Sequence, residues 1–148
     1  VRVIKSDIGR DLSCRTRYRS YNQDEIKQTG GLKLKSAYST FYKKSIYNWR
    51  FTEVEVVLQT GRTHQIRVHS KDLGCSIFGD PLYSKKNMLP ETFPIDVRKI
   101  LEKVNRQLLH AEMLGFFHPS SGKYFEFKAP VPNDFRLVLE TLAPYKVM

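Results

Sequence analysis

The chain has 148 residues, of which 41% are hydrophobic and 27% are charged, a composition typical of one globular domain with its own core. No apolar stretch approaches the about 20 residues that cross a bilayer, and no leader pattern is present, so we expect no membrane anchor. The chain opens at Val1 without a methionine, and we therefore interpret it as a portion of a longer protein.

Positive charge is concentrated in the first third of the chain. The net charge is +10, and residues 1–50 contain 12 Lys and Arg against 4 Asp and Glu. Such an excess favours a polyanionic partner, above all a nucleic acid, with an affinity that falls as salt is added. The alternative is a basic surface that is simply well hydrated.

The cysteines and histidines form no recognisable ligand pattern. Cys14 and Cys75 are isolated, which indicates a reducing intracellular compartment without distinguishing cytoplasm, nucleus or organelle. The four histidines lack the spacing of metal ligands, so we predict no metal site.

The first half of the chain contains the clearest strands. Residues 1–34 are basic and partly irregular in pattern, and we expect a loop with short strands there. Residues 35–42 are rich in aromatic and β-branched types and predict a strand. In residues 51–58, Val54, Val56 and Leu58 alternate with more polar positions, which predicts a strand with one buried face.

A strand–turn–helix corner follows that strand. Gly61 permits a sharp turn, Thr63 is suited to cap a helix that runs to about Leu73, and Gly74 is suited to end it. In such a corner the N–H groups of the first helical turn, with Arg62 beside them, can hold an anion.

The second half mixes short strands and helices. In order, we predict a loop with a short strand over 74–93, a helix over 95–104, strands over 108–117 and 123–128, and a final helix capped by Asn133 or Asp134. This succession indicates an α+β domain with a mixed, mainly antiparallel sheet flanked by helices.

The strongest chemical signal is the run of residues 60–69, which holds two arginines, two histidines and a glutamine at a strand exit. We interpret it as an RNA or phosphate site. The alternative is that Arg62 and Arg67 lie on a solvated helix face, paired with carboxylates such as Glu53 or Asp72. No carboxylate stands out as a catalyst, and Asp80, between Gly79 and Pro81, is best explained as a turn residue.

Residues 58–69 (LQTGRTHQIRVH) strongly resemble the signature of RNA pseudouridine synthases of the RluA type. The resemblance continues in order through shorter motifs at 35–39, 73–74, 77–83, 106–111, 117–122 and 129–135. It covers residues 35–142, which we define as the motif-bearing core.

This resemblance implies an enzyme that isomerises uridine to pseudouridine in structured RNA, either rRNA or tRNA, without cofactor or metal. The target nucleotide would be flipped into a pocket. Arg67 would pair with the nucleophilic aspartate, and the side chains near the RNA would be Arg62, Thr63, His64 and Gln65. We expect RNA as the partner, no membrane contact and a monomer.

The family's nucleophile lies in an R-L-D-x-x-T-S-G motif that nothing here matches, and its stacking tyrosine should also lie upstream. Residues 1–148 are therefore interpreted as the C-terminal part of one catalytic domain, active within a longer chain and inactive alone. Two alternatives remain: a non-catalytic RNA-binding module derived from the same fold, and a domain whose basic face binds a protein partner.

Overall fold

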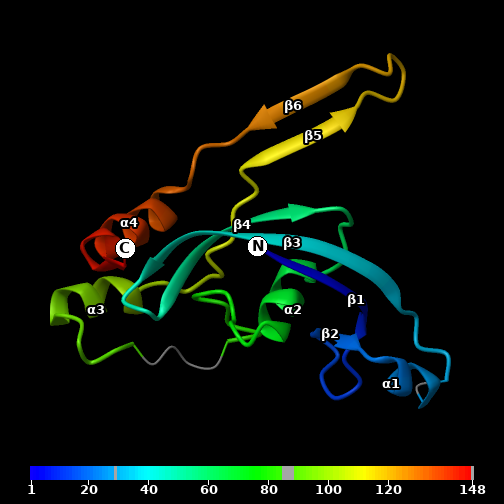
Figure 1. The fold of residues 1–148 in the computed structure, drawn as a ribbon, viewed down its shortest axis with the longest axis horizontal. Helices are drawn as coiled ribbons and strands as arrows, with labels where there is room; N and C mark the ends of the chain where they lie inside the picture. Colours follow the sequence, from blue (N-terminus) through cyan, green and yellow to red (C-terminus); the bar gives the residue numbers. More distant parts are fainter. Residues whose placement is uncertain (29, 85–88, 148) are drawn as a thin grey trace.

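An antiparallel sheet forms the centre of the molecule (Figure 1). The structure is a computed structural model and describes residues 1–28, 30–84 and 89–147. The strand order is β2-β1-β3-β4, and the short β7 also pairs with β3. The strands are β1 (Arg2–Arg10), β2 (Tyr18–Tyr21), β3 (Lys35–Tyr47), β4 (Phe51–Leu58) and β7 (Lys146–Val147). Every strand pair in the described residues is antiparallel, which confirms the mainly antiparallel α+β fold.

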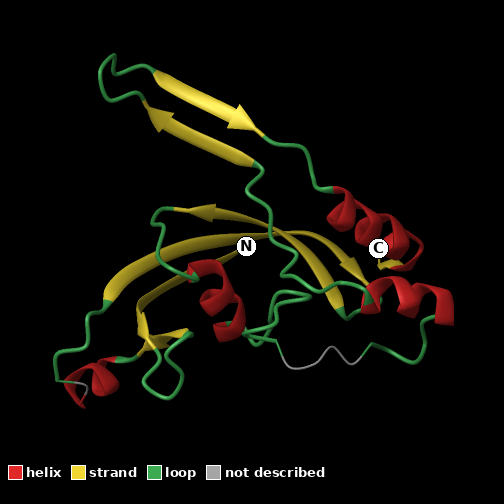
Figure 2. Cartoon of the chain, turned by 180° about the vertical axis from the view of Figure 1, so that it is seen from behind, coloured by secondary structure: helices red, strands yellow, loops and turns green. Residues whose placement is uncertain are grey.

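Helices pack at two separate places (Figure 2). The helix α2 packs against β1, β2 and β3, whereas α3 and α4 pack against each other at the far end. Their bounds are α1 (Gln23–Gln28), α2 (Gln65–Asp72), α3 (Ile95–Glu102) and α4 (Asn133–Leu142), the last continued by a 3₁₀ turn. None of the helices in the described residues has the length and apolarity needed to span a membrane.

Two hydrophobic clusters follow from this arrangement. The larger one lies at the α3–α4 end and is centred on Phe93, Leu101 and Leu142, each of them at most 2% exposed. The smaller one lies under α2 and consists of Ile8, Ala37, Val68 and Tyr83. Because the cluster under α2 is small, polar contacts contribute much of the packing there.

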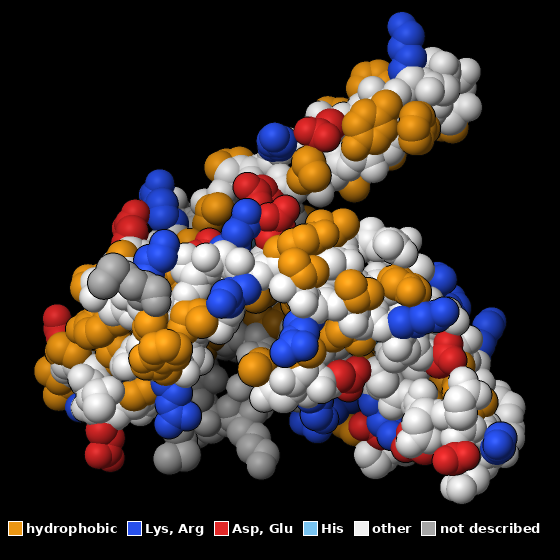
Figure 3. Space-filling view, in the orientation of Figure 1, with side chains coloured by type: hydrophobic (Ala, Val, Ile, Leu, Met, Phe, Trp, Pro, Cys, Tyr) orange, Lys and Arg blue, Asp and Glu red, His pale blue; other side chains and the backbone are white. Residues whose placement is uncertain are grey.

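The hairpin of β5 (Met113–Phe117) and β6 (Tyr124–Lys128) extends away from the sheet (Figure 1). All ten of its residues are exposed, and hydrophobic side chains cover much of its surface (Figure 3). The register pairs Phe116 with Phe125 and Leu114 with Phe127, so these four apolar side chains share one face. The strand predicted from residue 108 begins only at Met113, because Leu108 N–H donates to the Phe78 carbonyl instead (2.9 Å).

Several predicted elements differ from the structure. The predicted buried face of β4 is wrong, since Val54 and Leu58 are each 43% exposed. The physical reason is that β4 is an edge strand of the described sheet. The segment 1–34 is more regular than predicted, with a nine-residue β1. The short strand predicted within 74–93 is absent from the described residues, and positions 85–88 of that segment lie outside them.

Candidate functional site

The corner between β4 and α2 holds the predicted site. The helix begins at Gln65, and the preceding residue, His64, has a left-handed backbone with φ of 57° and no capping side chain. The predicted cap by Thr63 is therefore wrong. The Gln65 N–H already donates to the Arg62 carbonyl (3.0 Å), so it is not free to hold an anion as predicted. At the other end, Gly74 has the predicted left-handed conformation with φ of 78°.

Gln65 braces this corner from the inside. Its side-chain oxygen accepts hydrogen bonds from the Thr60 hydroxyl and the Arg62 N–H, both at 2.9 Å. Its amide nitrogen donates to the Tyr38 carbonyl (2.8 Å) and to Ser39 Oγ (2.9 Å). All four hydrogen-bonding positions of the amide are thus used, and the residue is only 3% exposed. These contacts leave no polar group of the Gln65 side chain free, and its predicted contact with RNA stays a prediction.

Arg67 forms a two-pronged ion pair with Asp80. Arg67 Nε donates to Oδ2 and Nη2 donates to Oδ1, both at 2.7 Å. The Asp80 side chain is fully buried and that of Arg67 is 12% exposed. The guanidinium also lies over the ring of Tyr83, 4.8 Å from its centroid. Arg67 is therefore not on a solvated helix face, and its partner is neither Glu53 nor Asp72.

A tight turn places Asp80 for this pairing. Its Oδ1 also accepts hydrogen bonds from the N–H groups of Leu82 (2.9 Å) and Tyr83 (3.0 Å). Gly79 has φ of 74°, and a Cβ there would collide with the Arg106 carbonyl. Asp80 is thus a turn residue, as predicted, but it is also the partner of Arg67, which the sequence analysis missed.

The electrostatics of the pair follow from these contacts. Burial acts to raise the pKa of Asp80, but the hydrogen bonds from Arg67 and from two backbone N–H groups outweigh it and leave the pKa below its ordinary value. The hydrogen bond to Asp80 in turn raises the pKa of Arg67. Both groups are therefore held in their charged forms.

His64 and Tyr83 lie beside the ion pair. His64 Nδ1 and the Tyr83 hydroxyl share a hydrogen bond of 2.9 Å, and the His64 ring meets the edge of Tyr18 at 5.6 Å between centroids. The Tyr83 hydroxyl also accepts from the Tyr18 N–H (2.7 Å). Burial and the nearby charge of Arg67 lower the pKa of His64, which favours a neutral ring next to the charged arginine.

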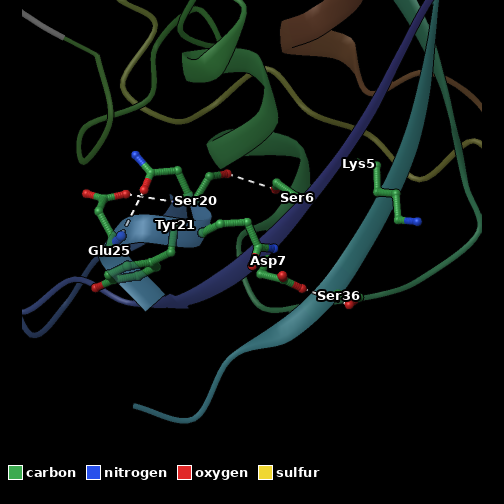
Figure 4. A pocket seen from close by; sticks show the side chains of 9 residues that line it. Lys5, Ser6, Asp7, Ser20, Tyr21, Glu25 and Ser36 are labelled. Carbon is green, nitrogen blue, oxygen red and sulfur yellow. Dashed lines mark hydrogen bonds between the residues drawn. The ribbon is translucent and has the colours of Figure 1, made fainter. Parts of the chain in front are cut away.

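His69 belongs to a buried hydrogen-bonded chain rather than to a ligand site. Its Nδ1 contacts Ser39 Oγ at 2.9 Å and its Nε2 contacts Ser6 Oγ at 3.0 Å. Ser6 is bonded in turn to Ser20 (2.8 Å; Figure 4). The Ser20 hydroxyl donates to Asp72 (2.5 Å). Burial lowers the pKa of His69. This chain joins α2 to three strands and accounts for the polar character of the packing under α2.

Arg62 and Thr63 line a pocket of about 440 Å³ on the outer side of the corner. Arg62 Nε donates to the Ser36 carbonyl (2.9 Å), which fixes the guanidinium at the pocket wall. Thr63 is exposed there. The structure thus brings together Arg62, Thr63 and His64 around one corner, with Arg67 packed behind them.

The remaining histidines and cysteines lie elsewhere. His110 Nε2 donates to the Ala129 carbonyl (3.1 Å) across the base of the hairpin, and His118 Nδ1 accepts from two N–H groups in its turn. Cys14 and Cys75 are both free thiols. In residues 1–28, 30–84 and 89–147, no three His, Cys, Asp or Glu side chains are grouped as metal ligands.

Comparison with known proteins finds homologues among the RNA pseudouridine synthases. The chain is 45% identical over 97 residues to an RNA pseudouridine synthase of Chlorobaculum parvum, covering 62% of this chain and 29% of that protein. It is 44% identical over 91 residues to ribosomal large subunit pseudouridine synthase D of Vibrio vulnificus, covering 62% and 28%. The chain is a homologue of the RNA pseudouridine synthases of the RluA type. No protein-family model matches it.

The fold of this pseudouridine synthase homologue is also similar to a solved structure. Human RNA pseudouridylate synthase domain containing 1 superposes with a TM-score of 0.52 at 24% identity, over 86% of this chain and 47% of the human one. That similarity confirms the fold. The chain spans less than a third of the length of the two bacterial relatives.

Proposed function

We propose that this chain is the arginine-bearing part of the catalytic domain of an enzyme that isomerises uridine to pseudouridine in structured RNA, either rRNA or tRNA. In that reaction the bond from C1′ to N1 of the base breaks and a bond from C1′ to C5 forms. The hydrogen on C5 is lost and N1 gains one, so the reaction needs no cofactor. The Arg67–Asp80 pair, inside a segment shared with such enzymes, is the observation that carries the proposal.

Arg67 would hold the nucleophilic aspartate, which residues outside 1–148 would supply. Asp80 occupies Nε and Nη2 of the guanidinium and fixes its plane, so Nη1 is the nitrogen that faces a second carboxylate. A nearby guanidinium keeps a carboxylate ionised and orients it through a charge-assisted hydrogen bond. In this role Arg67 is a positioning residue for the nucleophile.

Arg62, Thr63 and His64 would contact the RNA at the mouth of the site. Each is at least partly accessible, and Arg62 and Thr63 line the pocket beside the corner. Gln65 would act indirectly by holding their loop in place. A monomer in a reducing intracellular compartment remains our prediction for the whole protein.

Tritium release tests the proposal. The full-length protein is incubated with bulk tRNA or rRNA that carries tritium at uridine C5, and released tritium reports loss of that hydrogen. We expect release by the wild type and a loss of more than about 100-fold in Arg67→Ala, since the nucleophile would lose its charged partner. Near-normal release by Arg67→Ala would contradict the role of Arg67.

The alternative of a non-catalytic RNA-binding module has one observation in its favour, the absence of an R-L-D-x-x-T-S-G motif from these residues. It predicts salt-dependent RNA binding by the full-length protein with no tritium release at all.

A further inference from the structure

We propose that a cluster of three further cations, Arg10, Lys33 and Lys35, binds the RNA backbone next to Arg62. We name this cluster together with Arg62 the basic pocket. The inference rests on the proposed function and deepens it, because these three residues lie outside the signature segment and extend the RNA-binding surface onto β1 and the start of β3.

Three separate segments bring the cations of the basic pocket together. Lys35 is the register partner of Ile8, and Arg10 and Lys33 each lie two residues beyond that pair, at the end of β1 and before β3. The loop before α2 adds Arg62 across the pocket of about 440 Å³. Four of the nine lining residues are Lys or Arg and none is Asp or Glu. Like charges gathered in this way create a positive potential that an anion relieves.

These cations have no carboxylate partner in the described part of the chain. Other cations of the sheet and helices do: Arg19 pairs with Glu25 at 2.7 Å and Lys44 with Glu55 at 2.6 Å. Carboxylates therefore pair with cations elsewhere on the sheet, whereas none lines the basic pocket.

Two contacts fix the walls of the basic pocket. A Cβ on Gly9 would collide with the Leu34 side chain. Because glycine has no Cβ, the segment between Lys33 and Lys35 packs directly on β1. The Arg10 guanidinium lies over the Tyr18 ring, 5.8 Å from its centroid. A groove lined by four cations and by no carboxylate suits a nucleic acid strand, whose phosphates meet the cations along the groove.

A second pocket provides a contrast. It has a volume of about 650 Å³ and is lined by Lys5, Asp7, Glu25 and neighbouring polar residues (Figure 4). Its charges are of both signs, and Asp7 already accepts a hydrogen bond from Ser36 (2.7 Å). The basic pocket is therefore the better site for an anion.

A salt titration of RNA binding tests the inference in the full-length protein. The variant is R10Q/K33Q/K35Q, and the probe is a fluorescein-labelled stem–loop RNA with uridines in its loop, followed by anisotropy from about 50 to about 200 mM salt. Each lost phosphate contact with a single strand should reduce the slope of log affinity against log salt by about 0.7, so we expect a reduction of about 2. All three residues are exposed, and the variant should melt like the wild type.

The matched control removes the same charge elsewhere. Three exposed lysines lie on elements away from the basic pocket (Figure 1): Lys99 on α3, Lys103 directly after α3, and Lys123 in the hairpin turn. K99Q/K103Q/K123Q should keep the wild-type slope. Equal slopes for the basic-pocket variant and the wild type, with tritium release intact, would overturn the inference and leave the proposed function standing. Failure of the proposed function would appear instead as absent tritium release in the wild type.

Discussion

Arg62 and Arg67 lie five residues apart on one corner, yet they differ in burial and in hydrogen-bond partners. Arg67 is 12% exposed, and a fully buried carboxylate holds two of its nitrogens. Within the described residues, the Arg62 side chain has a backbone carbonyl as its only partner, and it lines the open basic pocket. A buried, fixed cation is suited to orient one reacting group, whereas exposed, unpaired cations are suited to bind a polyanion. Under the proposed function, Arg67 would serve the chemistry and Arg62 would serve RNA affinity.

The largest effect on folding should come from Asp80→Ala. It would leave the buried guanidinium of Arg67 without a partner, and we expect the free energy of unfolding to fall by about 3–5 kcal/mol. Urea unfolding of the full-length protein measures this. The matched control is Asp134→Ala, which removes an equally two-pronged pair with Arg106 at an exposed site and should destabilise the protein far less. Equal losses in the two variants would contradict the distinction between buried and exposed pairs.

Gly79→Ala should act on the same pair through the backbone. The position has φ of 74° and faces the Arg106 carbonyl, so an added Cβ both strains the turn and displaces the chain. We expect a loss of about 2 kcal/mol or more in a thermal melt, with the activity falling alongside. Gly122→Ala, at φ of 65° in open space, is the control and should lose about 1 kcal/mol. A neutral Gly79→Ala would show that the turn does not hold Asp80 in place.

Stability should fall as pH is lowered through about 6.5. Burial lowers the pKa of His69, so the folded protein resists a proton that the unfolded chain accepts. The stability linked to neutral His69 is complete above the pKa that this residue has in the unfolded chain, and it is lost as pH falls below that pKa. Melting temperatures at pH 7.5 and 5.5 should show this, and His69→Gln should flatten the dependence. Identical pH profiles for wild type and His69→Gln would count against this role of His69.

Arg62→Ala should have the smallest effect on folding and a clear one on binding. Its side chain makes one hydrogen bond at an exposed site, so the free energy of unfolding should change by no more than about 0.5 kcal/mol. The salt slope of RNA affinity should fall by about 0.7, as for each other cation of the basic pocket. Arg50→Ala, at the exposed turn between β3 and β4, should leave that slope unchanged. A normal slope in Arg62→Ala would remove Arg62 from the phosphate contacts.

The strand–turn–helix corner could be predicted from the sequence because its signal is local. The run from Thr60 to His69 contains the corner, and the turn signal at Gly79 correctly predicted the conformation around Asp80. The pairing of Arg67 with Asp80 could not be predicted, because thirteen residues and a change of direction separate them. Arg67 can be explained locally as a helix-surface residue and Asp80 as a turn residue, so only the three-dimensional structure shows that they pair.

Errors in the predicted elements have a common cause. Alternation in β4 indicates which residues share a face, but an edge strand need not bury that face. Thr63 has the chemistry of a helix cap, yet the Gln65 side chain supplies the bond that closes the corner. In the described residues, the lack of a covering element leaves the β4 face exposed, and a side-chain contact closes the start of α2. Tertiary structure thus outweighs local propensity in both cases.

The most direct test of the central claim is tritium release by full-length Arg67→Lys. Lysine keeps the positive charge but presents one nitrogen, so it cannot hold Asp80 with two bonds and a second carboxylate at the same time. We predict that release falls nearly as far as in Arg67→Ala, while RNA affinity and its salt slope stay at the wild-type values. Release within a few-fold of the wild type would contradict the claim that the fixed geometry of Arg67, rather than its charge alone, supports the reaction.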